Sequence, residues 1–405
     1  MNPCTSLAVA AAVVAAAVAG CSQPSPTTTP ESANGSVTSA TSAASATAGV
    51  TATDPAKVRF AVPNNFSLSA RWTAAVDREN PVLVTTEGIA VLRRSQTVSG
   101  FSVVFLDPRT GQPVWTSAPA PVDPDAALVA TASSGRPWLL MVWPLGKHEV
   151  TVRVYDALAV GSEVEPVREV VFTSPELAKA PPVVIAREDG VLISGTERGD
   201  LRFDPATGAT VPAPKSGFAA TVSANAWLMR LTDGGVGFVS DDGTKVWSTD
   251  ARDHSVRLLG SGSGFVVLGR SDPGVDDGPM AVSLHRAVDG SLLSTVRVSS
   301  EAVDRIPFLG YPVVVSDDAS TAVWGPALFR LATGEGAALD IAEETPIAVR
   351  QGVVYAGWGV RCRTLDAATA RVLSEVCGVA PLGFSATGDG VFLSEGTVYS
   401  VPLAQ

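Results

Sequence analysis

The sequence has few charged residues and no excess of basic ones. Charged side chains make up 17% of the 405 residues, and 29 Lys and Arg against 40 Asp and Glu give a net charge of −11. A chain of this sign repels polyanions, so nucleic acid is excluded as an expected partner. Hydrophobic residues nevertheless reach 46%, with 37 Gly and 29 Pro. This composition argues against a disordered chain, a coiled coil or a collagen, and predicts a globular, turn-rich protein.

The sequence also lacks the motifs of common catalytic and metal sites. It contains no Gly-x-Ser-x-Gly elbow, no Ser-x-x-Lys pair, no Walker loop and no Gly-x-Gly-x-x-Gly after a strand. None of the three His has a Cys, Asp or Glu at metal-ligand spacing. Acidic pairs could bind calcium but show no spaced Asp ladder, so we interpret them as turn carboxylates. The pairs are Asp241-Asp242, Asp276-Asp277 and Asp317-Asp318. We therefore predict no catalytic residue and no metal site, which weakens an enzymatic interpretation without excluding it.

No charged side chain occurs in the first 20 residues, and Leu7 to Val18 is almost entirely Ala and Val. Such a run is too short to span a bilayer but suits the core of a signal peptide. It ends in Val18-Ala19-Gly20-Cys21, which resembles the bacterial lipobox. In that family the Cys receives a diacylglycerol and becomes the first mature residue. The resemblance implies a lipoprotein signal peptide over 1–20 and lipid attachment at Cys21; a secretory signal with a chance Cys is the alternative.

The segment after Cys21 has the composition of a flexible linker. Residues 22–53 contain 15 Ser or Thr, seven Ala and three Pro, with Glu31 the only charge. A segment this polar cannot bury enough apolar surface to fold. Because two acyl chains give stable membrane attachment, we predict that residues 21–54 tether the protein to the outer, extracytoplasmic face of the cell membrane.

Residues 55–405 are predicted to form one all-β domain built from a repeat. They show no sustained helical periodicity and many short β-branched runs bounded by Gly, Asp and Pro. The sequence FLDPRTG at 105–111 recurs as RFDPATG at 202–208 and TLDAATA at 364–370, with weaker copies ending at 161, 243, 290 and 334. The six intervals between 111 and 370 average about 43 residues. Each copy predicts a hairpin, since Asp caps its own turn and Gly accepts a positive φ.

Two further strand-like runs precede each hairpin, so the unit has four strands, which is typical of a β-propeller blade. Trp115 and Trp247 follow Gly111 and Gly243 by four residues, and Trp72 lies one period earlier. The strands that should precede Trp72 occur instead at 383–401. The N-terminal strand is therefore predicted to complete the C-terminal blade and close a ring of eight antiparallel four-stranded blades. Seven blades is the alternative, if the short unit ending near Gly243 is irregular.

The pattern Asp-x-x-Thr-Gly-x-x-x-Trp at this period resembles the quinoprotein-like (PQQ-repeat) β-propeller superfamily. Some members of that superfamily are dehydrogenases with pyrroloquinoline quinone over the ring axis, and others are lipid-anchored envelope scaffolds or extracellular sensor domains. The dehydrogenases carry a vicinal Cys pair, a calcium site and a catalytic Asp. This chain has no vicinal Cys pair, and no segment transfers the calcium ligands or the Asp. The resemblance thus implies the fold, and we expect no quinone or other cofactor.

The remaining candidate residues are a Cys pair and a set of loop residues. Cys362 and Cys377 flank the last hairpin almost symmetrically, and an exported compartment permits oxidation, so we predict a disulfide. A redox-active pair is the alternative, but the Cys-x-x-Cys spacing is absent. The connections between second and third strands should share a face with the inter-blade crossovers. Solvated loop charge is the simplest interpretation of their polar residues, and partner contact is the functional one. The candidates are Arg93, Arg94, His148, Asp276 and Asp277.

These observations favour a monomeric, non-catalytic interaction, scaffold or sensor module of the cell envelope, with a protein or polymer as partner. The alternative is a binder of small ligands or carbohydrate, or an enzyme, that uses the central funnel of the ring.

The lipid anchor predicts the outcome of replacing Cys21. A Cys21→Ala variant should lose palmitate labelling and move from the membrane fraction to the soluble fraction, because the acyl chains supply the attachment. The matched control is Cys4→Ala, which changes a Cys inside the signal peptide and should leave labelling intact. Persistent labelling of Cys21→Ala would show that the lipid is attached elsewhere.

Overall fold

The computed structural model describes residues 52–53, 56–76, 81–95, 99–121, 126–187, 190–223, 225–250, 256–271, 278–306, 312–341, 344–358 and 361–404. In these ranges the chain is almost entirely β-strand, with one short helix, α1 (Ser300–Asp304). No helix within them is long and apolar enough to cross a membrane.

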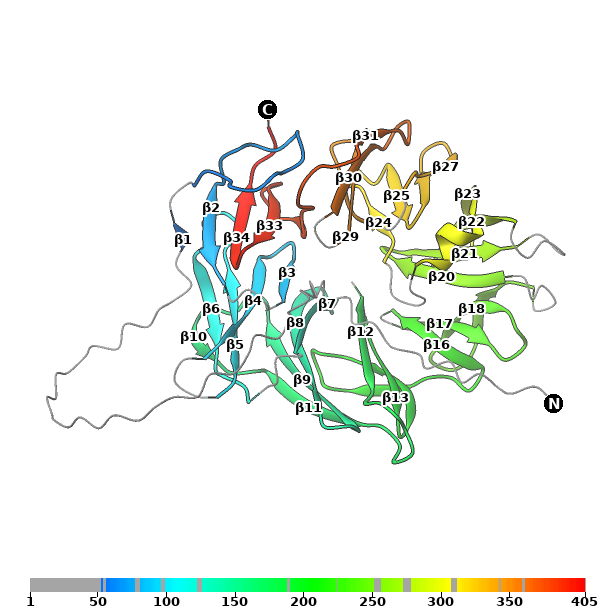
Figure 1. The fold of residues 1–405 in the computed structure, drawn as a ribbon. Coiled ribbons are helices and arrows are strands. Elements are labelled where there is room, and N and C mark those ends of the chain that lie inside the picture. The colour runs from blue at the N-terminus through cyan, green and yellow to red at the C-terminus, as the bar shows by residue number, and fades with distance from the viewer. Residues whose placement is uncertain are drawn as a thin grey trace, which may run out of the picture.

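The strands form eight sheets arranged in a ring, as Figure 1 shows. We name the sheets blades A to H and give their strands from the innermost outward. Blade A consists of β32 (Gly383–Phe384), β33 (Gly390–Ser394), β34 (Thr397–Val401), β2 (Trp72–Ala75) and β1 (Ala52–Thr53). Blade B consists of β3 (Val82–Val84), β4 (Ile89–Arg94), β5 (Phe101–Leu106), β6 (Pro113–Ser117) and β10 (Gly161–Val164). Blade C consists of β7 (Ala127–Ser133), β8 (Arg136–Leu145), β9 (Glu149–Asp156) and β11 (Arg168–Thr173). Blade D consists of β12 (Val183–Arg187), β13 (Gly190–Thr196), β14 (Gly199–Phe203) and β15 (Thr210–Pro212).

The second half of the ring repeats the pattern. Blade E consists of β16 (Gly217–Val222), β17 (Ala226–Leu231), β18 (Val236–Ser240) and β19 (Lys245–Ser248). Blade F consists of β20 (Val256–Gly262), β21 (Phe265–Arg270), β22 (Pro279–Arg286) and β23 (Leu292–Ser299). Blade G consists of β24 (Val314–Val315), β25 (Thr321–Trp324), β26 (Ala327–Arg330) and β27 (Gly336–Ala338). Blade H consists of β28 (Thr345–Arg350), β29 (Val353–Trp358), β30 (Arg361–Asp366) and β31 (Val372–Ser374). The predicted eight-bladed propeller is confirmed. The short unit that ends near Gly243 is a complete blade, so the seven-bladed alternative is wrong.

The ring closes where the two ends of the domain meet. Strand β2 pairs antiparallel with β34 through Trp72↔Ser400, Thr73↔Tyr399, Ala74↔Val398 and Ala75↔Thr397. In Figure 1 this pair is the blue strand beside the red one. The prediction that the N-terminal strand completes the C-terminal blade is confirmed. Closure of this kind leaves no unpaired inner or middle strand in the blade. Within the range assigned to the tether, β1 adds two further pairs to β2.

The repeated motif forms the turn between the third and fourth strands of blades B, D, E, F, G and H. In blade B the Asp107 carboxylate accepts hydrogen bonds from the backbone N–H of Arg109 (2.7 Å) and Thr110 (3.0 Å). Gly111 then takes φ +68°, in the left-handed region that favours glycine. The weak copy ending at Gly161 departs from this pattern. There the connection between β9 and β11 runs outward and forms β10, which pairs parallel with β6 of the preceding blade and so replaces a tight hairpin.

Tryptophan side chains join one blade to the hairpin of the next. Trp72 on β2 donates its indole N–H to the carbonyl of Pro108 (3.1 Å), and Trp247 on β19 donates to Ala287 (2.6 Å). Trp115 on β6 lies 3.4 Å from its acceptor, the carbonyl oxygen of Ala157. Trp72, Trp115 and Trp247 therefore all pack between blades.

The hydrophobic core lies between the blades, not in one central mass. One large cluster joins blades B and C and contains the fully buried Phe105, Trp115 and Tyr155. The Phe105 and Trp115 rings stack at 5.4 Å, and Trp115 and Tyr155 at 5.6 Å. Similar clusters join blades C and D, F and G, and G and H. Each blade is thus stabilised by its two neighbours.

The Trp contacts predict unequal effects at two equivalent glycines. A Cβ on Gly111 would lie 2.4 Å from the Trp72 ring, whereas a Cβ on Gly243, which has φ +86°, would meet nothing within 4 Å. Both Ala variants should lose about 1–2 kcal/mol from the positive φ alone. Gly111→Ala should lose roughly a further 1–3 kcal/mol because the ring must shift. Urea unfolding of both variants measures the difference, and equal losses would show that the Trp contact does not require glycine.

Candidate functional site

A cavity of about 630 Å³ lies in the central channel of the ring. The inner strands of three successive blades, β3, β7 and β12, form one wall, and Figure 1 shows them near the centre of the ring. The opposite wall is formed by Gly262 and Ser263 of blade F and by Pro312 and Val313, just before β24. The Ser263 hydroxyl lies 3.4 Å from the Val313 carbonyl oxygen, which joins the two parts of that wall. We call this cavity the axial pocket.

The lining of the axial pocket is mostly apolar, and its polar residues cluster at one end. The strands contribute aliphatic side chains such as Leu83, Leu128 and Ile185. The turns between first and second strands contribute hydroxyl groups and two ionisable side chains, Glu87 and Arg187. Thr86 in the same turn as Glu87 is exposed, so the pocket reaches the surface at this end.

Three polar side chains give this end of the pocket its chemistry. Arg187, the last residue of β12, donates to the carbonyl oxygen of Ala186 (3.0 Å), and burial lowers the pKa of its guanidinium. The Glu87 carboxylate accepts a hydrogen bond from the Thr86 hydroxyl (2.7 Å). Trp138 on β8 is 6% exposed, and its indole N–H has no hydrogen-bond partner within the described ranges. The pocket therefore offers buried hydrogen-bond donors beside an apolar wall.

The described lining holds few of the side chains that catalysis uses. Glycoside hydrolysis requires two facing carboxyl groups, and Glu87 is the one carboxylate among the described lining residues. Acyl transfer by a hydroxyl nucleophile requires an adjacent base, and the residues described in the lining include no His or Lys. In the part of the chain that the structure describes, no three His, Cys, Asp or Glu side chains gather at metal-binding distance.

Three of the candidate contact residues, Arg93, Arg94 and His148, lie on one face of two neighbouring blades. Arg93 and Arg94 end β4, and His148 lies in the turn between β8 and β9, so both positions are at connections between second and third strands. The Arg94 guanidinium carbon is 5.6 Å from the centroid of the Phe101 ring. Nδ1 of His148 is 3.5 Å from the Ser174 hydroxyl. Asp276, Asp277 and Cys21 lie outside the described residues.

The other two acidic pairs lie in turns, as expected from the sequence. Asp241 accepts a hydrogen bond from the Trp227 indole N–H (2.9 Å) and forms an ion pair with Arg202 (2.5 Å). Hydrogen bonds from the hydroxyl of Ser316 and from the backbone and hydroxyl of Ser320 lower the pKa of Asp318 to about 2. Asp318 thus stabilises its own turn, whereas Asp241 links its turn to β17 and to β14 of blade D.

An exposed apolar feature that was not predicted from the sequence lies on the same face. Leu145 is 51% exposed at the end of β8, and Leu177 is 97% exposed in the crossover from blade C to blade D. The Ser174 backbone N–H donates to the His148 carbonyl oxygen (2.7 Å), which holds this crossover against the β8–β9 turn. Lys147 and Lys179 are exposed in the same two segments. We call Leu145, Lys147, His148, Leu177 and Lys179 the corner patch.

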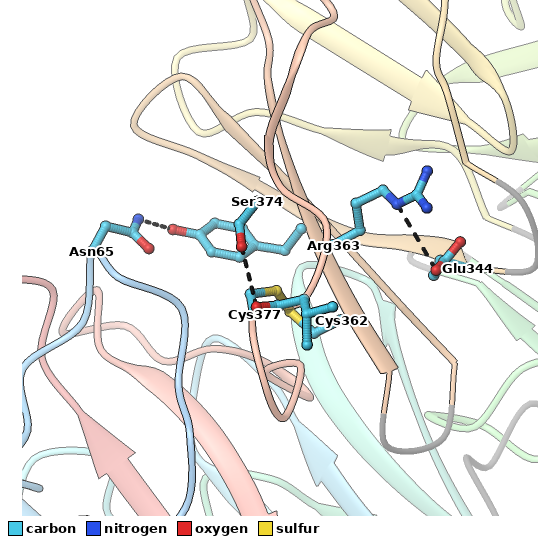
Figure 2. The surroundings of a disulfide bond; sticks show 8 residues. Asn65, Glu344, Cys362, Arg363, Ser374 and Cys377 are labelled. Carbon is cyan, nitrogen blue, oxygen red and sulfur yellow. Dashed lines mark hydrogen bonds and ion pairs between the residues drawn. A yellow bond between two sulfur atoms is a disulfide. The ribbon is translucent and has the colours of Figure 1, made fainter.

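The predicted disulfide between Cys362 and Cys377 is confirmed, with the two Cα atoms 5.0 Å apart. Figure 2 shows that it links β30 to the crossover that leads from blade H to blade A. The Cys377 N–H also donates to the Cys362 carbonyl oxygen (3.0 Å), and two residues later the Val379 N–H donates to Ala61 (2.9 Å). The disulfide thus fixes a crossover that the N-terminal segment contacts.

The same N-terminal segment covers the junction of blades H and A. Asn65 donates a hydrogen bond to the Tyr355 hydroxyl. Phe66 packs edge-on against Phe392 of blade A with ring centroids 5.0 Å apart, and lies 5.7 Å from Tyr355 of blade H. Residues 56–71 therefore join the first and last parts of the domain.

Comparison with known proteins gives similarities of fold. No protein-family model and no curated protein matches the chain. Among solved structures, an uncharacterized protein from Listeria monocytogenes EGD-e is 8% identical with a TM-score of 0.44, over 74% of this chain and 95% of that one. Dihydro-heme d1 dehydrogenase NirN in complex with DHE is 11% identical with a TM-score of 0.42, over 81% of this chain and 75% of that one.

The disulfide predicts a stability loss on reduction. A Cys362→Ser, Cys377→Ser double variant should lose up to about 3 kcal/mol of unfolding free energy, the chain-entropy value for a 15-residue loop. Adding a reductant should lower the wild-type denaturation midpoint and leave the double variant unchanged. A reductant effect of equal size on both proteins would show that the disulfide is not its cause.

Proposed function

We propose that this protein is a membrane-anchored, extracytoplasmic β-propeller that binds an envelope protein through the corner patch and catalyses no reaction. The observation that carries the proposal is the exposure of Leu145 (51%) and Leu177 (97%) beside two lysines, at the end of β8 and in the crossover that follows blade C. Exposed aliphatic side chains surrounded by charges are typical of protein-binding surfaces.

The charge of the patch indicates the chemistry of the partner. The chain as a whole carries −11, yet two of its five Lys lie in this patch. Glu176 is the one acidic residue in the crossover segment 174–180. Arg94 is exposed on the same face of the adjacent blade. A partner with an apolar pocket and an acidic rim would complement this surface.

The disposition of the domain also supports a role as an interaction module. The tether composition and the lipobox-like sequence place the expected anchor at the N-terminus, and the described chain enters the ring through β1 and β2 of blade A. A tether of this length has a reach of about 30 Å as a coil. The proposed arrangement holds a rigid face near the membrane and leaves it free to turn toward a partner.

The experiment that tests this function is cross-linking in intact cells. The tagged full chain should form a cross-linked adduct with its partner, and Leu177→Asp should reduce the adduct at least about ten-fold, because a charge would be buried at the centre of the contact. Leu373→Asp is the matched control, since Leu373 is 56% exposed on β31 of blade H. Equal adduct yields from the two variants would contradict the proposal.

A further inference from the structure

The axial pocket has the size and polarity of a small-molecule site, and the proposed protein contact does not use it. Its volume of about 630 Å³ lies inside the range of roughly 300–1000 Å³ that is usual for ligand pockets. The inner strands supply an apolar wall, and the turns at one end supply Thr85, Glu87 and Arg187. A ligand that fits this division has an apolar body and a polar head.

An unpaired buried donor in the lining points to a ligand. Trp138 is 6% exposed, and its indole N–H has no acceptor among the described residues. Buried N–H groups are normally paired, because an unpaired one loses its hydrogen bond to water and gains nothing in return. Trp138 pairs across the sheet with Thr131, which also lines the pocket near its polar end. A ligand acceptor atom at this end would satisfy the indole.

Arg187 determines the charge of the polar head. It is the one cationic side chain among the described lining residues, and its position at the end of β12 brings a guanidinium to the edge of an apolar wall. A guanidinium carries five donors in a planar fork that matches a carboxylate, so it can bind a ligand while it keeps its protein partners. Glu87 lines the same end and would repel a second negative charge. A single anionic charge therefore fits better than the double charge of a phosphate.

We propose that the axial pocket binds a small amphipathic carboxylate, with its carboxylate at Arg187 and the Trp138 indole N–H and its apolar body against β3, β7 and β12. The site is at the end of the channel formed by turns between first and second strands. The corner patch is at connections between second and third strands, at the opposite end of the blades. The two proposals therefore rest on different residues and can fail independently.

The test uses the purified full chain in lipid nanodiscs, with empty nanodiscs as the blank, and measures binding by titration calorimetry. Octanoate is the probe, and 1-octanol and octylamine share its apolar body with a neutral and a cationic head. Octanoate should bind saturably at one site and at least about ten-fold tighter than 1-octanol, which is the usual worth of a charge-assisted hydrogen bond. Absence of saturable octanoate binding, or tighter binding of octylamine, would overturn the proposal.

Variants separate the two donors. Arg187→Gln should weaken octanoate binding at least about ten-fold and leave 1-octanol unchanged, and Arg187→Lys should restore part of the loss. Trp138→Phe keeps the ring and removes the N–H, and should weaken octanoate roughly two-fold to ten-fold. Arg109→Gln, at an exposed hairpin residue outside the pocket, is the matched control and should bind as wild type. If Arg187→Gln and Arg109→Gln bind octanoate equally, the proposal is wrong.

Folding of each variant is checked by circular dichroism. If Arg187→Gln does not fold, the test rests on Trp138→Phe. Unchanged octanoate affinity in that variant overturns the proposed hydrogen bond from the indole N–H to the ligand, and weakened affinity supports it. The yield of the cross-linked adduct with the protein partner should be the same in every one of these variants, because Leu177 is unchanged in them. Loss of ligand binding is therefore distinguishable from loss of the partner contact.

Discussion

The contact between an indole ring and the hairpin of the next blade sets the geometry of this molecule. Trp72 and Trp247 each lie on the fourth strand of one blade and donate to a carbonyl in the next, and the ring packs where the glycine of the hairpin has no Cβ. The glycine is needed twice, once for its positive φ and once for the space above it. An indole N–H reaches the next blade in this way at the junctions A–B, B–C and E–F, and there it fixes how one blade packs on the next.

The ring is held closed at the place where the first and last strands of the domain meet, and three features of the structure contribute. Strand β2 pairs with β34, the segment 56–71 packs over the junction of blades H and A, and the disulfide fixes the crossover between those blades. The buried Asp389 carboxylate accepts hydrogen bonds from Arg71 and Ser400, which links the start of β2 to the C-terminal strands of blade A. The closure thus combines backbone pairing, aromatic packing and a covalent bond in one sector of the ring.

Features repeated along the chain could be predicted from sequence, and features that depend on how blades meet could not. The hairpin motif, its period and the displaced Trp72 are local patterns, and they predicted eight blades, the closure and the Cys362–Cys377 pair. The pairing of β10 with β6 joins residues of different blades, so the weak repeat near Gly161 gave no sign of it. The axial pocket combines Arg187, Trp138 and Val313 from three blades. The corner patch was missed because exposure of Leu177 depends on the path of a crossover, although a lone Leu in the polar run 174–180 was a visible hint.

The path of the chain into blade A has a mechanical consequence. A force applied at Ala52 meets the two-residue ladder between β1 and β2 first. It next meets the loop 56–70, which is held by the hydrogen bonds from Val58 to Leu68 and from Ala70 to Ala56. Only after these have opened does the load reach the four pairs between β2 and β34. These hydrogen bonds therefore break one group after another. The segment that leads into β2 extends under tension while the ring keeps its shape.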